Sequence, residues 1–318
     1  MLQSLISLLP GSGANARTRR RGVAESSAGP LPAQAEMGGW IWTDSADSVR
    51  NSYIRARRSF SLESRPDCAV LAASADSKYK LYVNGVYVGK GPVRSGDGYV
   101  YYDTHEITGL LRPGLNAVAF LVHHFGESTF GYVPAAPGLI CRLDIQHGDR
   151  VETIVTDETW KVCHALDWTS EGDRMSPRLW FQEVYDAERL TADWNSADAS
   201  EESWSSAVVV GRPPSAPWGE LRAREIPLLA EERFLPSGVV GVFNSPEFDR
   251  DTPVPKLPDI MAAAELSPLT AGRVEDVRAL MAPDGLTVVR TPRGGTGVVV
   301  ILDFGREVFG NVELGIAD

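Results

Sequence analysis

The sequence predicts an all-β protein, in which one antiparallel β-sandwich is followed by a second, incomplete β-sandwich domain. From Trp40 onward, short strand-like runs are separated by turn residues at regular spacing, and no long amphipathic helix interrupts them. Residues 78–88 carry the signature of a β-hairpin. Residues 116–123 form a nearly continuous apolar run, which is typical of a strand buried in a sandwich core.

The hairpin can be assigned residue by residue. Tyr79, Leu81 and Val83 alternate with Lys and Tyr neighbours, which is the period-two pattern of a half-buried strand. Asn84 and Gly85 then provide the two positive-φ residues of a type I′ turn. A return strand follows directly and ends in a loop rich in glycine. Nothing in the hairpin itself is chemically reactive.

Other strands are predicted from the same alternation or from short apolar runs between turns. Residues 194–207 instead combine acidic and serine residues with two tryptophans, which predicts a surface loop anchored by aromatic side chains. The strands expected on either side of the hairpin are residues 52–62, 68–74, 99–103, 116–123, 139–146 and 150–156.

The proline-rich stretch at 230–258 separates the two parts of the chain, because its prolines are too frequent for a helix or a central strand. Beyond it, we expect two short helices and two strands, at residues 259–266, 274–281, 286–290 and 297–304. The expected regions are a disordered tail or misassigned start (1–36), a β-sandwich (37–229), a linker (230–258) and the start of a truncated second β-domain (259–318).

The first 36 residues offer no periodicity and are rich in Gly, Ala, Ser, Pro and Arg. Their arginines follow the short apolar start instead of preceding it, which inverts the order of a secretory signal. Met37 directly precedes the first strand-like residues and would make a natural start codon. We therefore expect a cytoplasmic protein, with secretion as the alternative.

Composition excludes several classes of partner. The 318 residues carry 31 basic and 42 acidic side chains, for a net charge of −11, which argues against a nucleic-acid or anionic-membrane surface. No apolar run approaches the roughly 20 residues of a membrane span. The three cysteines lack CxxC spacing and are expected to pack as small apolar residues rather than form disulfides or a zinc site.

Catalytic motifs are absent from the sequence. The chain contains no HExxH, GxSxG, GxGxxG or P-loop pattern. It therefore lacks the motifs that zinc peptidases, α/β-hydrolases and nucleotide-binding enzymes use for catalysis or binding. A glycosidase needs two carboxylates about 5–9.5 Å apart. Asp97 with Asp103, or Glu183 with Asp186, could be drawn as such a pair, but acidic residues near turns are usually solvated or capping.

Two histidines end the apolar strand. Adjacent side chains in a strand point to opposite faces, so His123 and His124 could not chelate one ion without a bend. We expect one to be packed and the other to be solvated or hydrogen-bonded. The alternative is a ligand-contacting role for the loop that includes His124 and Glu127. Four tryptophans could form a sugar-stacking platform, although large aromatic residues are more often anchors: Trp168, Trp180, Trp194 and Trp218.

Several segments together resemble the N-terminal β-domains of bacterial α-L-rhamnosidase-like glycoside hydrolases. The EVYDA unit (183–187) and the DFGREVFG unit (303–310), in that order, are the most specific; Glu188 departs from the family, which tends to place Arg there. The hairpin and the strand at 116–123 are shared with galactose-binding-like jelly rolls of many glycosidases. The other resembling segments are residues 40–42, 73–92, 101–127, 156–162 and 193–207.

The resemblance implies that the sandwich is a galactose-binding-like jelly roll and that the catalytic acids lie on a downstream (α/α)6 barrel, which this chain lacks. The chain is then expected to be the non-catalytic N-terminal part of an α-L-rhamnosidase-type hydrolase, inactive alone, with that catalytic domain and a rhamnose-containing glycoside as partners. The alternative is a stand-alone carbohydrate-binding module. No cofactor is expected, and no motif supports calcium. The candidate sugar contacts are Asp97, His124, Glu127, Trp180, Glu183 and Asp186.

Overall fold

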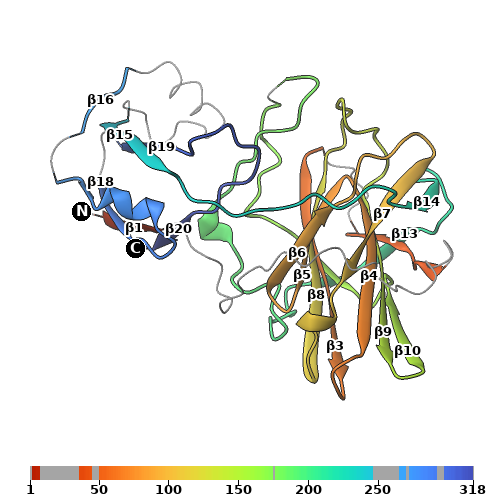
Figure 1. Ribbon diagram of the computed structural model, residues 1–318. Helices are drawn as coiled ribbons and strands as arrows, with labels where there is room; N and C mark the ends of the chain where they lie inside the picture. The colour runs from red at the N-terminus through yellow and green to blue at the C-terminus, as the bar shows by residue number, and fades with distance from the viewer. Residues whose placement is uncertain are drawn as a thin grey trace. The chain divides into compact units, whose positions relative to one another are not determined.

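In the computed structural model, the described residues are 2–7, 36–44, 50–174, 176–245, 265–269, 272–291 and 297–317. They form two compact units, one comprising residues 22–228 and the other the first 21 residues together with 229–318 (Figure 1). Within the described ranges, the secondary structure is almost entirely strand, with only short 3-10 turns. The prediction of an all-β chain is confirmed.

The larger unit is a sandwich of two sheets (Figure 1). The first sheet has the order β13 (Val208–Gly211), β2 (Trp40–Trp42), β9 (Gly138–His147), β4 (Cys68–Asp76), β7 (Tyr99–Glu106) and β14 (Glu220–Ala223), with β10 (Arg150–Val155) paired to β9. The second has the order β12 (Ser205–Ser206), β11 (Lys161–His164), β3 (Ser52–Leu62), β8 (Gly114–His124), β5 (Lys78–Val83) and β6 (Val86–Gly91). Two 3-10 turns lie in the connections, η2 (Thr108–Leu110) and η3 (Ala187–Arg189).

The predicted hairpin is β5–β6. Buried and partly buried residues alternate along β5, and both turn residues adopt positive φ, 51° at Asn84 and 81° at Gly85. The Asn84 side chain also ties the turn to the next strand, because its amide donates to Asn116 Oδ1 and its oxygen accepts from the Ala117 amide. The turn is therefore fixed by its own backbone preference and by a cross-strand side-chain network.

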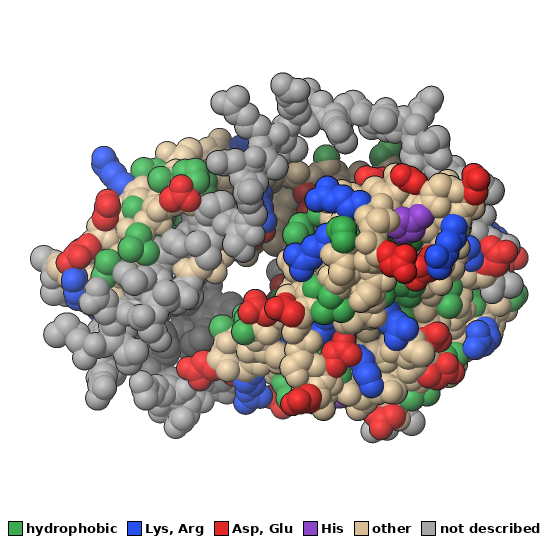
Figure 2. Space-filling model, turned by 90° about the horizontal axis from the view of Figure 1, so that it is seen from below, with side chains coloured by type: hydrophobic (Ala, Val, Ile, Leu, Met, Phe, Trp, Pro, Cys, Tyr) green, Lys and Arg blue, Asp and Glu red, His purple; other side chains and the backbone are tan. Residues whose placement is uncertain are grey.

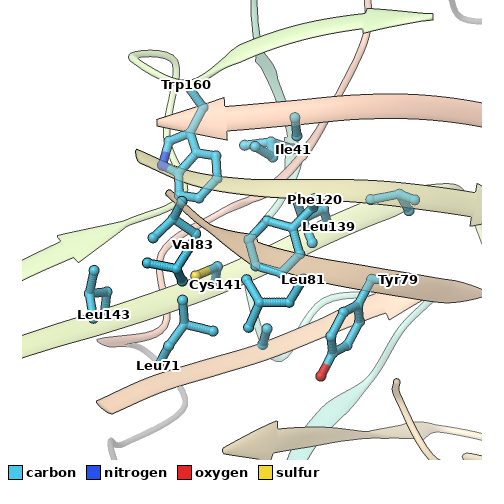
Figure 3. Close-up of a cluster of buried hydrophobic side chains, with 14 of the residues drawn as sticks. Ile41, Leu71, Tyr79, Leu81, Val83, Phe120, Leu139, Cys141, Leu143 and Trp160 are labelled. Atoms are coloured by element: carbon cyan, nitrogen blue, oxygen red, sulfur yellow. The ribbon is translucent and has the colours of Figure 1, made fainter. Parts of the chain in front are cut away.

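The core lies between the two sheets (Figure 3). Leu71 of β4 and Cys141 of β9 face Leu81 of β5 and Phe120 of β8, and all four are buried. Each fully buried side chain of this size contributes about 1.5–3 kcal/mol to folding, less for the smaller cysteine. Cys141 behaves as the small apolar residue that we expected, and all three cysteines are free.

The outer face of the second sheet is covered by the long segment after β11. Trp194 and Trp204 are buried there against β3 and β8, as the prediction of an aromatic-anchored loop required. Arg57 of β3 is fully buried and donates hydrogen bonds to the carbonyl oxygens of Ser196 and Ala199 in the same segment. The segment is thereby held on the sheet by two buried tryptophan rings and by the hydrogen bonds of Arg57 to its backbone.

The smaller unit contains two small sheets. One has the order β17 (Val274–Glu275), β18 (Thr287–Thr291), β1 (Leu2–Ser7) and β20 (Gly315–Ala317). The other has the order β16 (Ser267–Pro268), β15 (Gly238–Asn244) and β19 (Val298–Asp303). A 3-10 turn, η5 (Val277–Met281), follows β17.

Three details differ from expectation. Residues 2–7 form a strand rather than a tail, because they pair with β18 and β20. The proline-free run between Pro236 and Pro246 forms β15 inside the expected linker. The expected helix at 274–281 is β17 followed by η5, since Asp276 adopts a positive φ of 53°. Most of the other expected helix, 259–266, lies outside the described residues.

Candidate functional site

A pocket lies in the larger unit, at the end of the sandwich where β4 and β8 end and β3 begins. This end is opposite the β9–β10 hairpin, because Asp76 pairs with Gly138 at one end of β4 and Cys68 with Gln146 at the other (Figure 1). The pocket is small, with a volume of about 60 Å³, and it opens to solvent. Its walls are residues 75–78, 92–98, 100, 131–135 and 217–218.

The opposite end of the sandwich carries side chains of both charges. Seen from that side, acidic and basic side chains are interspersed, and neither charge gathers in one large patch (Figure 2).

Asp76, the last residue of β4, is the polar centre of the pocket wall. It is buried, and its Oδ1 accepts hydrogen bonds from Tyr132 OH at 2.6 Å, His124 Nδ1 at 2.7 Å and Ser77 Oγ at 3.3 Å. Burial, and to a smaller extent the negative charge of Asp76, raise the pKa of Tyr132 well above its ordinary value. The phenol therefore stays protonated and donates its hydrogen bond to Asp76. With all three donors on Oδ1, the structure records no hydrogen bond to Oδ2 from the described residues.

Lys78, the first residue of β5, lies on the same wall. Its ammonium donates a hydrogen bond to the Pro92 carbonyl oxygen at 2.8 Å and lies 5.9 Å from the centre of the Trp180 ring. Burial lowers the pKa of Lys78.

Trp180 stands beside the pocket with its side chain still accessible. The residue is 38% exposed, whereas most aromatic residues of the sandwich are buried. Its ring packs against Phe125 at 4.8 Å between centroids. A Cβ at Gly131, which lines the pocket, would lie only 3.3 Å from the ring, so the absence of a side chain there lets Trp180 approach the pocket wall.

Three predicted sugar contacts belong to this region. Asp97 lines the pocket from the β6–β7 loop and is exposed. His124 is buried, does not line the pocket, and is linked to it by the hydrogen bond between its Nδ1 and Asp76 Oδ1. Trp180 adjoins the pocket through Gly131 and Lys78.

The other three predicted contacts do not line the pocket. Glu127 bridges two arginines, at 2.6 Å from Arg50 Nε and 3.0 Å from Arg174 Nη1, and therefore ties two loops together. Glu183 is exposed on the segment after Trp180. Asp186 caps η3 by accepting from the Glu188 amide.

The two histidines point to opposite sides of the sheet, as the strand pattern predicts. His123 stacks on Tyr53 at 3.8 Å between ring centroids, and its Nε2 lies 2.8 Å from Asn51 Oδ1. Burial lowers the pKa of His123 to about 3, so this ring stays neutral. His124 faces the other way, towards Asp76 and Trp42.

The four tryptophans do not form one stacking platform. Trp218 is buried and stacks on Trp40 on the outer side of the first sheet. Trp168 stacks on Tyr53, and Trp194 is buried over the second sheet. The interpretation as anchors holds for these three, although the buried Trp218 also lines the pocket, and Trp180 is the exposed tryptophan beside it.

One of the carboxylates considered for catalysis, Asp103, is already paired. Asp103 is fully buried and accepts hydrogen bonds from Tyr79 OH at 2.7 Å and Arg224 Nη1 at 2.9 Å, so its charge is already neutralised. Within the described ranges, no group of three or more His, Cys, Asp or Glu side chains could hold a metal ion. No helix in that part of the chain is long and apolar enough to cross a membrane.

Sequence reasoning missed Asp76, Lys78 and Tyr132, which are central to the pocket. Each was counted as part of a strand, a turn or a loop without a role. The only available signal was position, because Asp76 and Ser77 form the tight connection between two strands at the loop end of the sandwich.

Comparison with known proteins identifies the family. Residues 64–227 match the alpha-L-rhamnosidase N-terminal domain. An alpha-L-rhamnosidase of Streptomyces avermitilis is 30% identical over 150 residues, which are 43% of this chain and 14% of that protein.

Among solved structures, the GH78 family rhamnosidase of Bacillus sp. GL1 is 36% identical, with a TM-score of 0.61 over 65% of this chain and 22% of that one. The alpha-L-rhamnosidase of Dictyoglumus thermophilum has a TM-score of 0.50 at 21% identity, over 66% of this chain and 26% of that one, which supports the fold. This chain thus spans about a seventh to a quarter of the length of these relatives. The family match covers about half of this chain, which therefore belongs to the alpha-L-rhamnosidase N-terminal domain family.

Proposed function

We propose that this chain is a non-catalytic module of an α-L-rhamnosidase-type glycoside hydrolase, and that it binds carbohydrate in the pocket beside Trp180. The observation that carries the proposal is the convergence of an accessible indole ring, the Asp76 carboxylate and the Lys78 ammonium at one loop end of the sandwich.

This convergence matches the chemistry of a sugar. A pyranose ring has apolar C–H faces that stack on aromatic rings, and hydroxyl edges that both donate and accept hydrogen bonds. Trp180 offers the ring, Asp76 Oδ2 an acceptor and Lys78 a donor. Because three donors already hold Asp76, little side-chain freedom is lost when a hydroxyl binds to it.

Rhamnose-containing glycosides are the proposed ligands, since the relatives that share the family are named rhamnosidases. A catalytic domain of the same enzyme is the proposed partner, and supplies the carboxylates for hydrolysis. The paired state of Asp103 and the capping role of Asp186 support a non-catalytic role for this chain. A stand-alone binding module would use the same pocket.

Calorimetric titration tests the binding. We expect rhamnose or a rhamnose-containing oligosaccharide to bind with a Kd of about 1 mM, and Trp180→Ala to weaken binding about tenfold through the loss of stacking. Tyr185→Ala is the matched control, because Tyr185 is an aromatic residue of similar exposure, 44%, that packs against Trp168 and not against the pocket-lining Lys78 and Gly131. Absence of heat with any of these sugars at millimolar concentration, or an equal loss in both variants, would contradict the proposal.

Hydrolysis is a separate test. The purified chain is expected to release no product from an aryl α-L-rhamnoside, under conditions in which a complete rhamnosidase does. Turnover that disappears in Glu183→Gln or Asp186→Asn would show that the chain carries its own catalytic carboxylates.

A further inference from the structure

The ammonium of Lys78 has no counter-ion in the described part of the chain. Its recorded contacts are the Pro92 carbonyl oxygen and the face of Trp180, and no ion pair is recorded for it. Burying a charge is costly unless an opposite charge or several hydrogen bonds compensate it. One carbonyl and one ring compensate this ammonium only in part, and burial accordingly lowers the pKa of Lys78.

Nearby charges do not remove this imbalance. Asp103 and Arg224 are the charged groups that act most on Lys78, and they are paired with each other at 2.9 Å. The Asp76 carboxylate is satisfied at Oδ1 by three donors. Asp97 and Arg94 lie on the β6–β7 loop, where both are exposed to solvent and their charges are screened.

We propose that the pocket accepts an acidic sugar, a uronic-acid residue, whose carboxylate pairs with Lys78. This inference rests on the proposed carbohydrate-binding function and names the class of ligand. The Lys78 nitrogen lies over the Trp180 ring, 5.9 Å from its centre, so a sugar carboxylate that pairs with the ammonium also lies beside that ring. Asp76 Oδ2 then accepts from a hydroxyl of the same or the neighbouring sugar.

The partly buried position of Lys78 gives such a pair its selectivity. An ion pair at an exposed site is weakened by water and salt, whereas one formed over an aromatic ring in a pocket is screened less. A carboxylate also accepts a charge-assisted hydrogen bond, which is stronger than the bond from an ammonium to a neutral hydroxyl. The pocket therefore discriminates between a uronate and its neutral counterpart.

The test compares two ligands that differ only in this charge. The full chain is titrated with a disaccharide of rhamnose and a hexuronate, and with the methyl ester of the same disaccharide. We expect the acid to bind about tenfold more tightly than the ester, which corresponds to about 1.4 kcal/mol, and this ratio to fall at high salt. Lys78→Gln should bring the ratio to one while the ester still binds, and Lys78→Arg should keep a preference for the acid.

Lys161→Gln is the matched control, since it removes the same charge at a lysine that bonds Ser206 outside the pocket, and it should leave the ratio unchanged. Equal affinity for acid and ester in the wild-type chain, or a preference that survives Lys78→Gln, overturns this inference but leaves the carbohydrate-binding proposal in place. Failure of both ligands to bind overturns both. If the Lys78→Gln variant no longer binds the ester, the Lys78→Arg variant decides the matter. A preference of Lys78→Arg for the acid over the ester supports the ion pair, and equal affinity for the two ligands overturns this inference.

Discussion

The described side chains of the two units differ greatly in how many apolar ones are buried. In the sandwich, three clusters of buried residues fill the space between the sheets and the outer face of each sheet. Among the described side chains of the smaller unit, the buried hydrophobic residues are Leu280 and Val289. The same unit leaves Phe309 fully exposed and Val312 83% exposed.

This difference indicates where the stability of the chain resides. Burial of apolar area is the main favourable contribution to folding, and it must exceed the conformational entropy lost by every ordered residue. The sandwich meets this condition with many large buried side chains. Among its described side chains, the smaller unit has few that are large and buried, so we expect it to open at a much lower free energy.

Limited proteolysis gives the largest expected contrast. We expect the first cuts between residues 229 and 258 and within the smaller unit, at rates orders of magnitude above those in the sandwich, because regional opening free energies range from near zero to the global value. A fragment of residues 37–230 should remain folded and monomeric, while the complete chain self-associates through its exposed strand edges and apolar side chains. A monomeric, uniformly resistant complete chain would show that the two units are equally stable.

The sandwich could be predicted from the sequence because its signals are local. Period-two alternation in residues 78–83 and the Asn84–Gly85 turn lie within a few residues of each other, and the continuous run that became β8 identifies a strand buried on both sides. The strand β1 could not be predicted in the same way. Its partners, β18 and β20, lie almost 300 residues away in the chain.

The pocket was only partly predictable for the same reason. Two of the three donors to Asp76 lie 48 and 56 residues further along the chain, and no pattern in the sequence predicts such contacts. The sequence predicts His124 as a sugar contact because it ends an apolar strand next to a loop. The fold instead turns it inward as a support for Asp76, and the loop that it precedes contributes Tyr132.

Alanine substitution of two phenylalanines, one buried and one exposed, tests the contrast in burial through its effect on stability. Phe120 is fully buried between Tyr79 and Trp160, so Phe120→Ala should lower the free energy of unfolding of the sandwich by about 3–5 kcal/mol. Phe309→Ala should change stability by less than about 0.5 kcal/mol, since this ring is exposed. Urea denaturation followed by tryptophan fluorescence measures both. A large effect at Phe309 would mean that its ring is covered in solution.

Two ion pairs provide the smallest contrast. Arg55 and Asp167 are buried in the sandwich, 2.6 Å apart, whereas Arg233 and Glu313 of the smaller unit are exposed and 3.2 Å apart. Arg55→Met leaves the Asp167 carboxylate buried without its partner and should cost about 3 kcal/mol. Arg233→Met should cost less than about 1 kcal/mol, because water solvates the remaining Glu313.

A double variant distinguishes the stability lost by leaving one charge unpaired from the stability that the intact ion pair contributes. If the penalty comes from the unpaired charge, Arg55→Met combined with Asp167→Leu should recover most of the stability lost in Arg55→Met alone. Two polar atoms of the native pair, Arg55 Nε and Asp167 Oδ1, are buried without a recorded hydrogen-bond partner. The native pair therefore already carries a desolvation cost, which favours recovery of stability in the double variant. If the double variant is as unstable as the single one, the pair itself stabilises the sandwich, and the cation of Arg55 over Trp194 at 5.1 Å is the contact to test next.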